Sequence, residues 1–232
     1  MTQSPSRKSR LLRKFDKAIG RIRPLLVTRF GPEQSDLFIN EAHREYENLI
    51  PQLPYMGYRN PFTVFMRPAT WYLAVYRTLK RHGVTLEDTG QLIYQMGEAD
   101  LNAIHPFVRS LIRYLWFAPL LHNRLKKRAA TSQLRKYPAD FVFSYVEGDG
   151  DAFDYGIDYT ECANCKFLKE QGAMELAPYA CAVDIAASEL MGWGLTRTMT
   201  LAEGYEKCDF RFKKRGATKV TLPESLTRTL RP

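Results

Sequence analysis

Residues 140–166 read DFVFSYVEGDGDAFDYGIDYTECANCK, and this stretch decides the fold class. Most of its first eight residues are aromatic or β-branched, which is typical of a strand. Gly148 to Asp151 supply turn-forming residues, and from Phe153 to Tyr159 apolar side chains alternate with polar residues or glycine. Two such runs around a turn predict a β-hairpin with one buried face. We expect Thr160 to cap a short helix that has Cys162 in its first turn, where unpaired backbone N–H groups and the helix dipole favour a thiolate.

Hydrophobic periodicity assigns the remaining elements. After the hairpin we expect a short helix ending at Gly172, a longer helix over about 175–191, and strands over 195–201 and 207–213. Before it, helical spacing predicts helices over 10–30 (kinked at Pro24), 32–50, 62–81 and 106–135. Another helix is expected to follow Thr85, which can cap it with the acid three residues later. The predicted fold is therefore α+β: a helical N-terminal half packed on a C-terminal half that has a small antiparallel sheet and the order β-β-α-α-β-β.

The chain divides by composition into four regions. We expect a basic amphipathic arm over 1–30, a helical region over 31–136, a cysteine-containing α+β region over 137–216, and a loosely attached tail over 217–232. With 232 residues, 45% hydrophobic and 25% charged, the chain is of globular composition, which argues against a disordered, collagen-like or disulfide-scaffold protein. No apolar run approaches the ~18 residues of a membrane-spanning helix, and no export signal is evident. These features predict a soluble, cytoplasmic protein.

Positive charge is concentrated in two segments. The net charge is +9, and residues 1–30 alone hold nine basic side chains and one acid, so nucleic-acid binding is not expected of the fold itself. The arm is expected either to pack on the body as an amphipathic helix or to contact an anionic surface or partner. Residues 101–139 hold eight basic side chains and no acid. That segment predicts a solvated helix face beside an acidic neighbour, or alternatively a phosphate-binding surface.

All four cysteines fall in the last third of the chain, at Cys162, Cys165, Cys181 and Cys208. In a chain without an export signal, thiols are reduced, catalytic or metal-bound more often than they form disulfides. The Cys162–Cys165 pair fits a metal-ligand pair, a redox dithiol or two incidental cysteines. A four-thiolate zinc or iron–sulfur site is geometrically open, although the spacing is not that of a standard zinc ribbon. The cofactor is therefore unknown from sequence, and a cysteine nucleophile would need none.

Charged residues accompany these thiols. Asp184 lies one helical turn after Cys181, where a carboxylate can act as general base beside a thiol. Arg197 shares a strand face with apolar residues, so it either reaches solvent from a sheet edge or is held inside to grip an anionic substrate. In the last strand, Cys208 points to one face, and Asp209 and Arg211 point to the other.

Four segments together resemble the L-2-amino-thiazoline-4-carboxylic acid hydrolase family. They are Tyr159–Lys166 (YTECANCK), Glu175–Asp184 (ELAPYACAVD), Leu195–Gly204 (LTRTMTLAEG) and Cys208–Phe212 (CDFRF). The similarity is dense over about 140–213 and looser over the helical half. It implies a hydrolase that opens a small carboxylated cyclic amidine, converting aminothiazoline carboxylate to a carbamoyl-cysteine.

The resemblance also implies roles for individual residues. Cys162, Cys181, Asp184 and Cys208 would be catalytic, and Arg197, Asp209 and Arg211 would bind substrate. A thiolate of Cys162 or Cys181, or a hydroxide held by a thiolate-bound metal, would attack the ring carbon between sulfur and nitrogen. Two alternatives stay open from the residues: a non-catalytic metal- or small-ligand-binding module built on the four cysteines, and a thiol redox protein using Cys162 and Cys165.

Overall fold

Helices form the N-terminal half of the computed structural model, which describes residues 5–58, 60–222 and 226–228. In chain order they are α1 Pro5–Arg21, α2 Arg23–Phe30, α3 Pro32–Leu49, the short 3₁₀ helix η1 Ile50–Gln52, α4 Thr63–Arg81, α5 Leu86–Asn102, α6 Pro106–Trp116 and α7 Pro119–Ser132. The C-terminal half contains β1 Val142–Glu147, β2 Tyr155–Glu161, α8 Ala163–Glu170, η2 Met174–Leu176, α9 Ala177–Met191, β3 Leu195–Arg197, η3 Leu201–Glu203, β4 Cys208–Phe212 and β5 Lys219–Val220. The predicted α+β class and the order β-β-α-α-β-β are confirmed.

The sheet has the strand order β1-β2-β4-β3-β5. Its pairs are antiparallel except for β3 and β5, which are parallel, so the sheet is mixed rather than wholly antiparallel as predicted. In the β2–β4 ladder, Tyr159 lies opposite Cys208 and Tyr155 opposite Phe212. Because side chains alternate along a strand, these residues share the inner face of the sheet.

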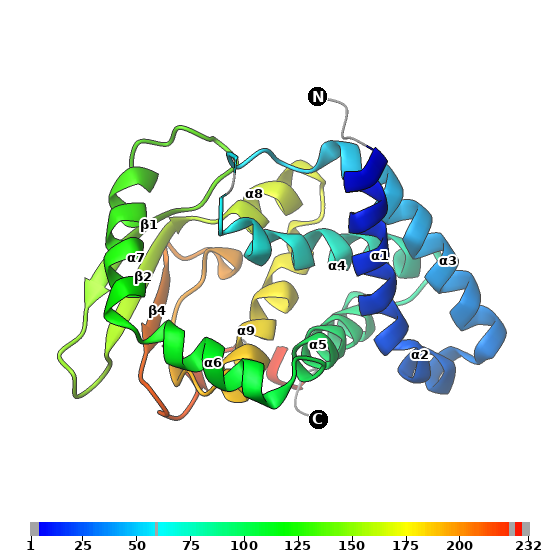
Figure 1. Cartoon of the computed structure of the whole chain (residues 1–232). Coiled ribbons are helices and arrows are strands. Elements are labelled where there is room, and N and C mark those ends of the chain that lie inside the picture. The colour runs from blue at the N-terminus through cyan, green and yellow to red at the C-terminus, as the bar shows by residue number, and fades with distance from the viewer. Residues whose placement is uncertain (1–4, 59, 223–225, 229–232) are drawn as a thin grey trace.

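Figure 1 shows how the two halves meet. The sheet and helices α1, α2 and α3 lie at opposite ends, with α4, α8 and α9 between them, while α7 lies beside β1 and β2. One cluster of buried side chains runs from Phe15 on α1 to Phe212 on β4, so both halves share a core. Among the described residues, no helix combines the length and the apolar character that crossing a bilayer demands.

The basic N-terminal segment packs on the body as an amphipathic helix, which was one of the two roles expected for it. Phe15 and Ile22 have no exposed surface, while the basic side chains between the apolar positions of α1 face solvent. The expected kink is a break at Ile22, after which α2 starts with Pro24 in its first turn, where a missing N–H costs nothing.

Two elements are shorter than the periodicity predicted. The helix expected over 106–135 is split, because Ala118 is extended and Pro119 starts a new helix. The strand expected over 195–201 ends at Arg197. Beyond it, the backbone N–H groups of Thr198 and Met199 donate to the Asp209 carboxylate, at 2.8 and 2.7 Å, instead of extending the strand.

The tail is attached more firmly than expected. β5 adds a strand beside β3, and Leu226 is buried against Tyr179 and Ala182 of α9. The rest of the predicted tail, 223–225 and 229–232, lies outside the described residues.

Candidate functional site

The predicted thiols, carboxylate and guanidinium come together at the inner face of the sheet. Cys162 precedes α8, Cys181 and Asp184 lie on α9, Arg197 ends β3 and Cys208 begins β4. Arg197 contacts both Asp184 and the Cys181 backbone. Burial is the main cause that shifts the pKa of the Cys181 thiol, and the other four groups lie near enough to shift it as well. Residues separated by up to 46 positions in sequence therefore form one cluster.

Arg197 is held inside, which decides between the two orientations that its strand position left open. It is 1% exposed, and its Nη1 donates to Asp184 Oδ2 at 2.7 Å and to the Cys181 carbonyl oxygen at 3.3 Å. The guanidinium lies over the Phe210 ring, 5.2 Å from its centroid. Its Nε is buried and has no hydrogen-bond partner among the described residues. One edge of the fork is thus committed to α9, and a donor on the other edge is unpaired.

Asp184 combines a desolvated environment with accessibility. Burial raises the pKa of its carboxyl, and the nearby Arg197 opposes this shift without cancelling it. The side chain nevertheless stays 42% exposed, so a small molecule can reach it. A carboxyl with a raised pKa can take up and return a proton more readily than an ordinary aspartate.

Cys162 occupies the N-cap position of α8 rather than its first turn, and Thr160 is still part of β2, so the predicted cap by Thr160 is wrong. The pKa of the Cys162 thiol is raised well above its ordinary value, first because it donates a hydrogen bond to Cys165 and then because of burial. The backbone N–H groups of Asn164 and Cys165 act in the opposite direction. The resting state is therefore the thiol, not the thiolate that the sequence predicted, although donors for a thiolate are in place.

The other two site thiols are also protonated at rest. Burial raises the pKa of Cys181 and raises that of Cys208 to about 12. The Cys208 Sγ accepts a hydrogen bond from the Leu201 backbone N–H at 3.2 Å, so Cys208 contributes to the shape of the loop as well. Within the described ranges, no three His, Cys, Asp or Glu side chains are grouped as metal ligands would be.

The cluster also contains two tyrosines, which the sequence analysis did not single out. Burial raises the pKa of Tyr159, and charge at Cys162, Asp184 and Cys208 raises it further, so its phenol lies among these groups. The pKa of Tyr72 on α4 is raised by burial and by charge at Asp100 and Asp184. Tyr159 could have been found from the sequence, because it alternates with the polar residues of β2 and precedes Cys162 by three positions.

Asp209 and Arg211 lie away from the cluster, on the other face of the sheet. Besides the two backbone donors, the Asp209 carboxylate accepts a hydrogen bond from the Thr198 hydroxyl at 2.6 Å, which fixes the loop directly after Arg197. Arg211 Nη1 donates to Asp158 Oδ1 at 2.7 Å. Both side chains are thus engaged with the protein, and Asp209 can position Arg197 through the chain.

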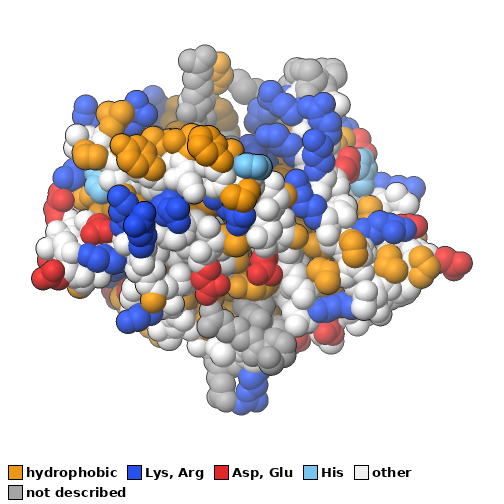
Figure 2. Space-filling model, turned by 60° about the horizontal axis from the view of Figure 1, so that its bottom comes forward, with side chains coloured by type: hydrophobic (Ala, Val, Ile, Leu, Met, Phe, Trp, Pro, Cys, Tyr) orange, Lys and Arg blue, Asp and Glu red, His pale blue; other side chains and the backbone are white. Residues whose placement is uncertain are grey.

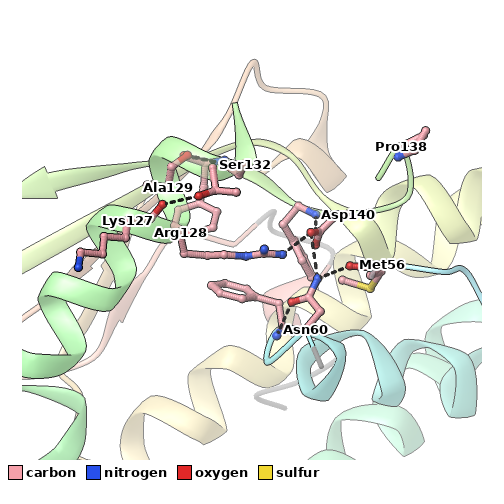
Figure 3. Close-up of polar contacts among 12 residues, drawn as sticks. Met56, Asn60, Lys127, Arg128, Ala129, Ser132, Pro138 and Asp140 are labelled. Atoms are coloured by element: carbon pink, nitrogen blue, oxygen red, sulfur yellow. Dashed lines mark hydrogen bonds and ion pairs between the residues drawn. The ribbon is translucent and has the colours of Figure 1, made fainter. Parts of the chain in front are cut away.

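A buried polar network around Asp140 joins the loop before α4 to α7 and to the segment before β1 (Figure 3). The Asp140 carboxylate accepts hydrogen bonds from Asn60 Nδ2 at 2.9 Å and from the Phe141 N–H at 2.8 Å, and it pairs with Arg128. Lys166 on α8 donates to the Asp140 carbonyl oxygen at 2.9 Å. The loop before α4, helix α7, the start of β1 and α8 are therefore joined at one point.

Comparison with known proteins identifies a family. Residues 65–212 match the family described as L-2-amino-thiazoline-4-carboxylic acid hydrolase, a span that contains every residue of the cluster. Neither the curated proteins nor the solved structures contain a match. The family's name supports a hydrolase, in agreement with the resemblance seen in the four sequence segments. The chain belongs to the L-2-amino-thiazoline-4-carboxylic acid hydrolase family.

Proposed function

We propose that the protein opens a small carboxylated cyclic amidine by hydrolysis, with 2-aminothiazoline-4-carboxylate as the model substrate. The carrying observation is Arg197, which is buried, paired on one edge with Asp184, and unpaired at Nε among the described residues. A guanidinium binds a carboxylate through two parallel N–H groups, which gives geometric selectivity as well as affinity. Substrate bound there would have its ring beside Asp184 and the thiols.

The chemistry follows from the neighbouring groups. Asp184 in its carboxylate form takes the proton of the Cys181 or the Cys162 thiol, and the thiolate adds to the ring carbon between sulfur and nitrogen. One ring bond then breaks, and Asp184 returns the proton to the departing sulfur or nitrogen. Water attacks the same carbon and releases the enzyme thiol, so the net reaction adds one water and gives a carbamoyl-cysteine.

The two thiols offer different advantages as nucleophile. Cys181 lies one helical turn from Asp184, while Cys162 has two backbone N–H groups that stabilise its thiolate. Tyr159 lies among both and can donate a hydrogen bond to charge that develops during attack. A single set of cysteine variants separates the two assignments.

The test is turnover of 2-aminothiazoline-4-carboxylate by the reduced protein, with products identified by mass spectrometry. We expect S- or N-carbamoyl-cysteine from the wild type, and the isomer tells which ring bond breaks. Cys181→Ala and Cys162→Ala identify the nucleophile, and Cys165→Ala is the matched control that retains activity. Full turnover by the Cys162, Cys181 and Asp184→Asn variants alike would refute the assignment.

A second substrate isolates the role of Arg197. We expect 2-aminothiazoline, which lacks the carboxylate, to have a kcat/KM lower by roughly 10- to 100-fold, as a charged hydrogen-bonded pair implies. Arg197→Lys should bring the kcat/KM values of the two substrates closer together, because an ammonium cannot reproduce the two parallel N–H groups of the guanidinium. An unchanged ratio would remove Arg197 from substrate binding.

A thiol redox function is the second candidate, favoured by the hydrogen bond between the Cys162 and Cys165 thiols. Rapid, reversible disulfide formation between them without turnover of any ring substrate would select it. Turnover that persists in Cys165→Ala and is insensitive to chelators would select the cysteine-nucleophile hydrolase instead.

A further inference from the structure

Helix α6 presents its apolar side to solvent. Its large hydrophobic side chains are 42–72% exposed, at Phe107, Val108, Leu111, Tyr114 and Leu115. The spacing i, i+1, i+4, i+7, i+8 places all of them on one side of the helix. No residue of α6 is buried. A surface helix normally turns this side toward the core, so the orientation of α6 is reversed.

The opposite side of α6 fixes that orientation. Arg109, Ile112, Arg113 and Trp116 are the partly buried residues, and they repeat at i, i+3, i+4, i+7. Trp116 stacks on Trp193, with ring centroids 4.3 Å apart and planes 14° apart. The contact between Trp116 and Trp193 therefore holds α6 with its apolar side facing solvent.

Positive charge surrounds this apolar side. Figure 2 shows a run of hydrophobic side chains along the surface with Lys and Arg side chains around it. On α7, Leu120 is 63% exposed. Arg124 and Lys127 are also exposed and follow it at i+4 and i+7, on the same side of α7. Neither cation has an acidic partner in the part of the chain that the structure describes. Residues 101–139 contain no acid at all.

We propose that α6 and the first turns of α7 dock on an anionic phospholipid bilayer. The apolar side chains of α6, with Leu120, enter the boundary between headgroups and acyl chains, and Arg124 and Lys127 contact the headgroups. A helix with an apolar and aromatic side flanked by Lys and Arg has the properties that interfacial binding needs. A second copy of the chain fits less well, because a two-fold contact would bring the same cations together with no acid between 101 and 139 to pair with them.

The experiment is co-sedimentation of the full chain with vesicles of phosphatidylcholine alone or mixed in equal parts with phosphatidylglycerol. We expect binding to the mixed vesicles that weakens with added salt, and little binding to phosphatidylcholine. Leu111→Asp should lower the partition coefficient at least tenfold. Leu37→Asp, at a 43% exposed position on α3, is the matched control and should bind as the wild type does.

Charge is tested separately from insertion. Replacing Arg124 and Lys127 together by Gln should lower partitioning roughly 30-fold, since each cation near an anionic surface contributes about fivefold. Far-ultraviolet circular dichroism verifies that each variant is folded. Absence of binding to mixed vesicles, or equal binding by Leu111→Asp and Leu37→Asp, would overturn the proposal. So would a dimer that depends on Leu111 and forms without vesicle binding, which would assign this surface to a second copy.

Discussion

Replacing Asp140 by alanine should destabilise the protein by about 3–4 kcal/mol. The side chain is 10% exposed and receives three donors: the Asn60 amide, the Phe141 N–H and the Arg128 guanidinium. The hydrogen bonds from the two neutral donors are taken at about 1 kcal/mol each, and the one from the charged guanidinium at about 1.5–3. Arg128 remains 25% exposed, so water replaces part of its pairing and the lower end of that range applies.

The assay is urea denaturation followed by circular dichroism, with the free energy of unfolding taken from the midpoint and slope. Asp140→Asn keeps one acceptor oxygen and should lose only about half as much. Asp151→Ala removes an exposed carboxylate of the β-hairpin and should change the free energy by no more than ~0.5 kcal/mol. If Asp140→Ala cost less than about 1 kcal/mol, or no more than Asp151→Ala, the network would not be what fastens the loop before α4 to α7 and β1.

Three further outcomes are expected. Folding raises the pKa of the Asp184 carboxyl, so its contribution to stability is full below its ordinary pKa of 3.8 and is lost as pH rises through the pKa of the folded state. The urea midpoint of the wild type should therefore fall with rising pH relative to that of Asp184→Asn. Midpoints of the two proteins that change in parallel with pH would contradict the raised pKa. The site thiols should react with iodoacetamide more slowly than free cysteine at neutral pH, and their own rates should rise at alkaline pH, as peptide mass spectrometry can follow. Cys208 should react slowest of the three, because it is buried whereas Cys162 and Cys181 are partly exposed. Fast labelling at neutral pH would mean a thiolate. Gly90→Ala should cost about 1–3 kcal/mol, since a Cβ there would lie 2.0 Å from the Tyr179 ring, whereas Gly20→Ala, with nothing within 4 Å, should gain about 0.5–1 by helix propensity. Calorimetry that ranks these two variants in the opposite order would contradict the close approach of α5 and α9.

Local patterns in the sequence were sufficient for the hairpin, for most of the helices and for the placement of Cys181 and Asp184 one turn apart on α9. Alternation placed Cys208 and Asp209 on opposite faces of the sheet, because side chains alternate along a strand whatever surrounds it. Thr85 caps α5 as predicted, through a hydrogen bond from the Asp88 N–H at 3.1 Å, since capping involves only neighbouring residues.

Features that depend on distant contacts were not predictable. Asn60 and Asp140 meet across 80 residues, and neither belongs to a recognisable motif. The prediction of a thiolate at Cys162 was wrong. The hydrogen bond to Cys165 and burial raise the pKa of its thiol more than the backbone N–H groups at the start of α8 lower it. For α6, the sequence reveals two sides of different polarity, but only tertiary packing decides which side faces inward.

The stacked pair of Trp116 and Trp193 gives the protein an optical signature. Two of its three tryptophans are in this one contact, which joins the end of α6 to the segment after α9. Parallel indoles at this separation couple their electronic transitions, so circular dichroism should contain an exciton couplet that disappears when either ring is replaced. The amplitude of that couplet reports whether α6 is seated, without any label added to the chain.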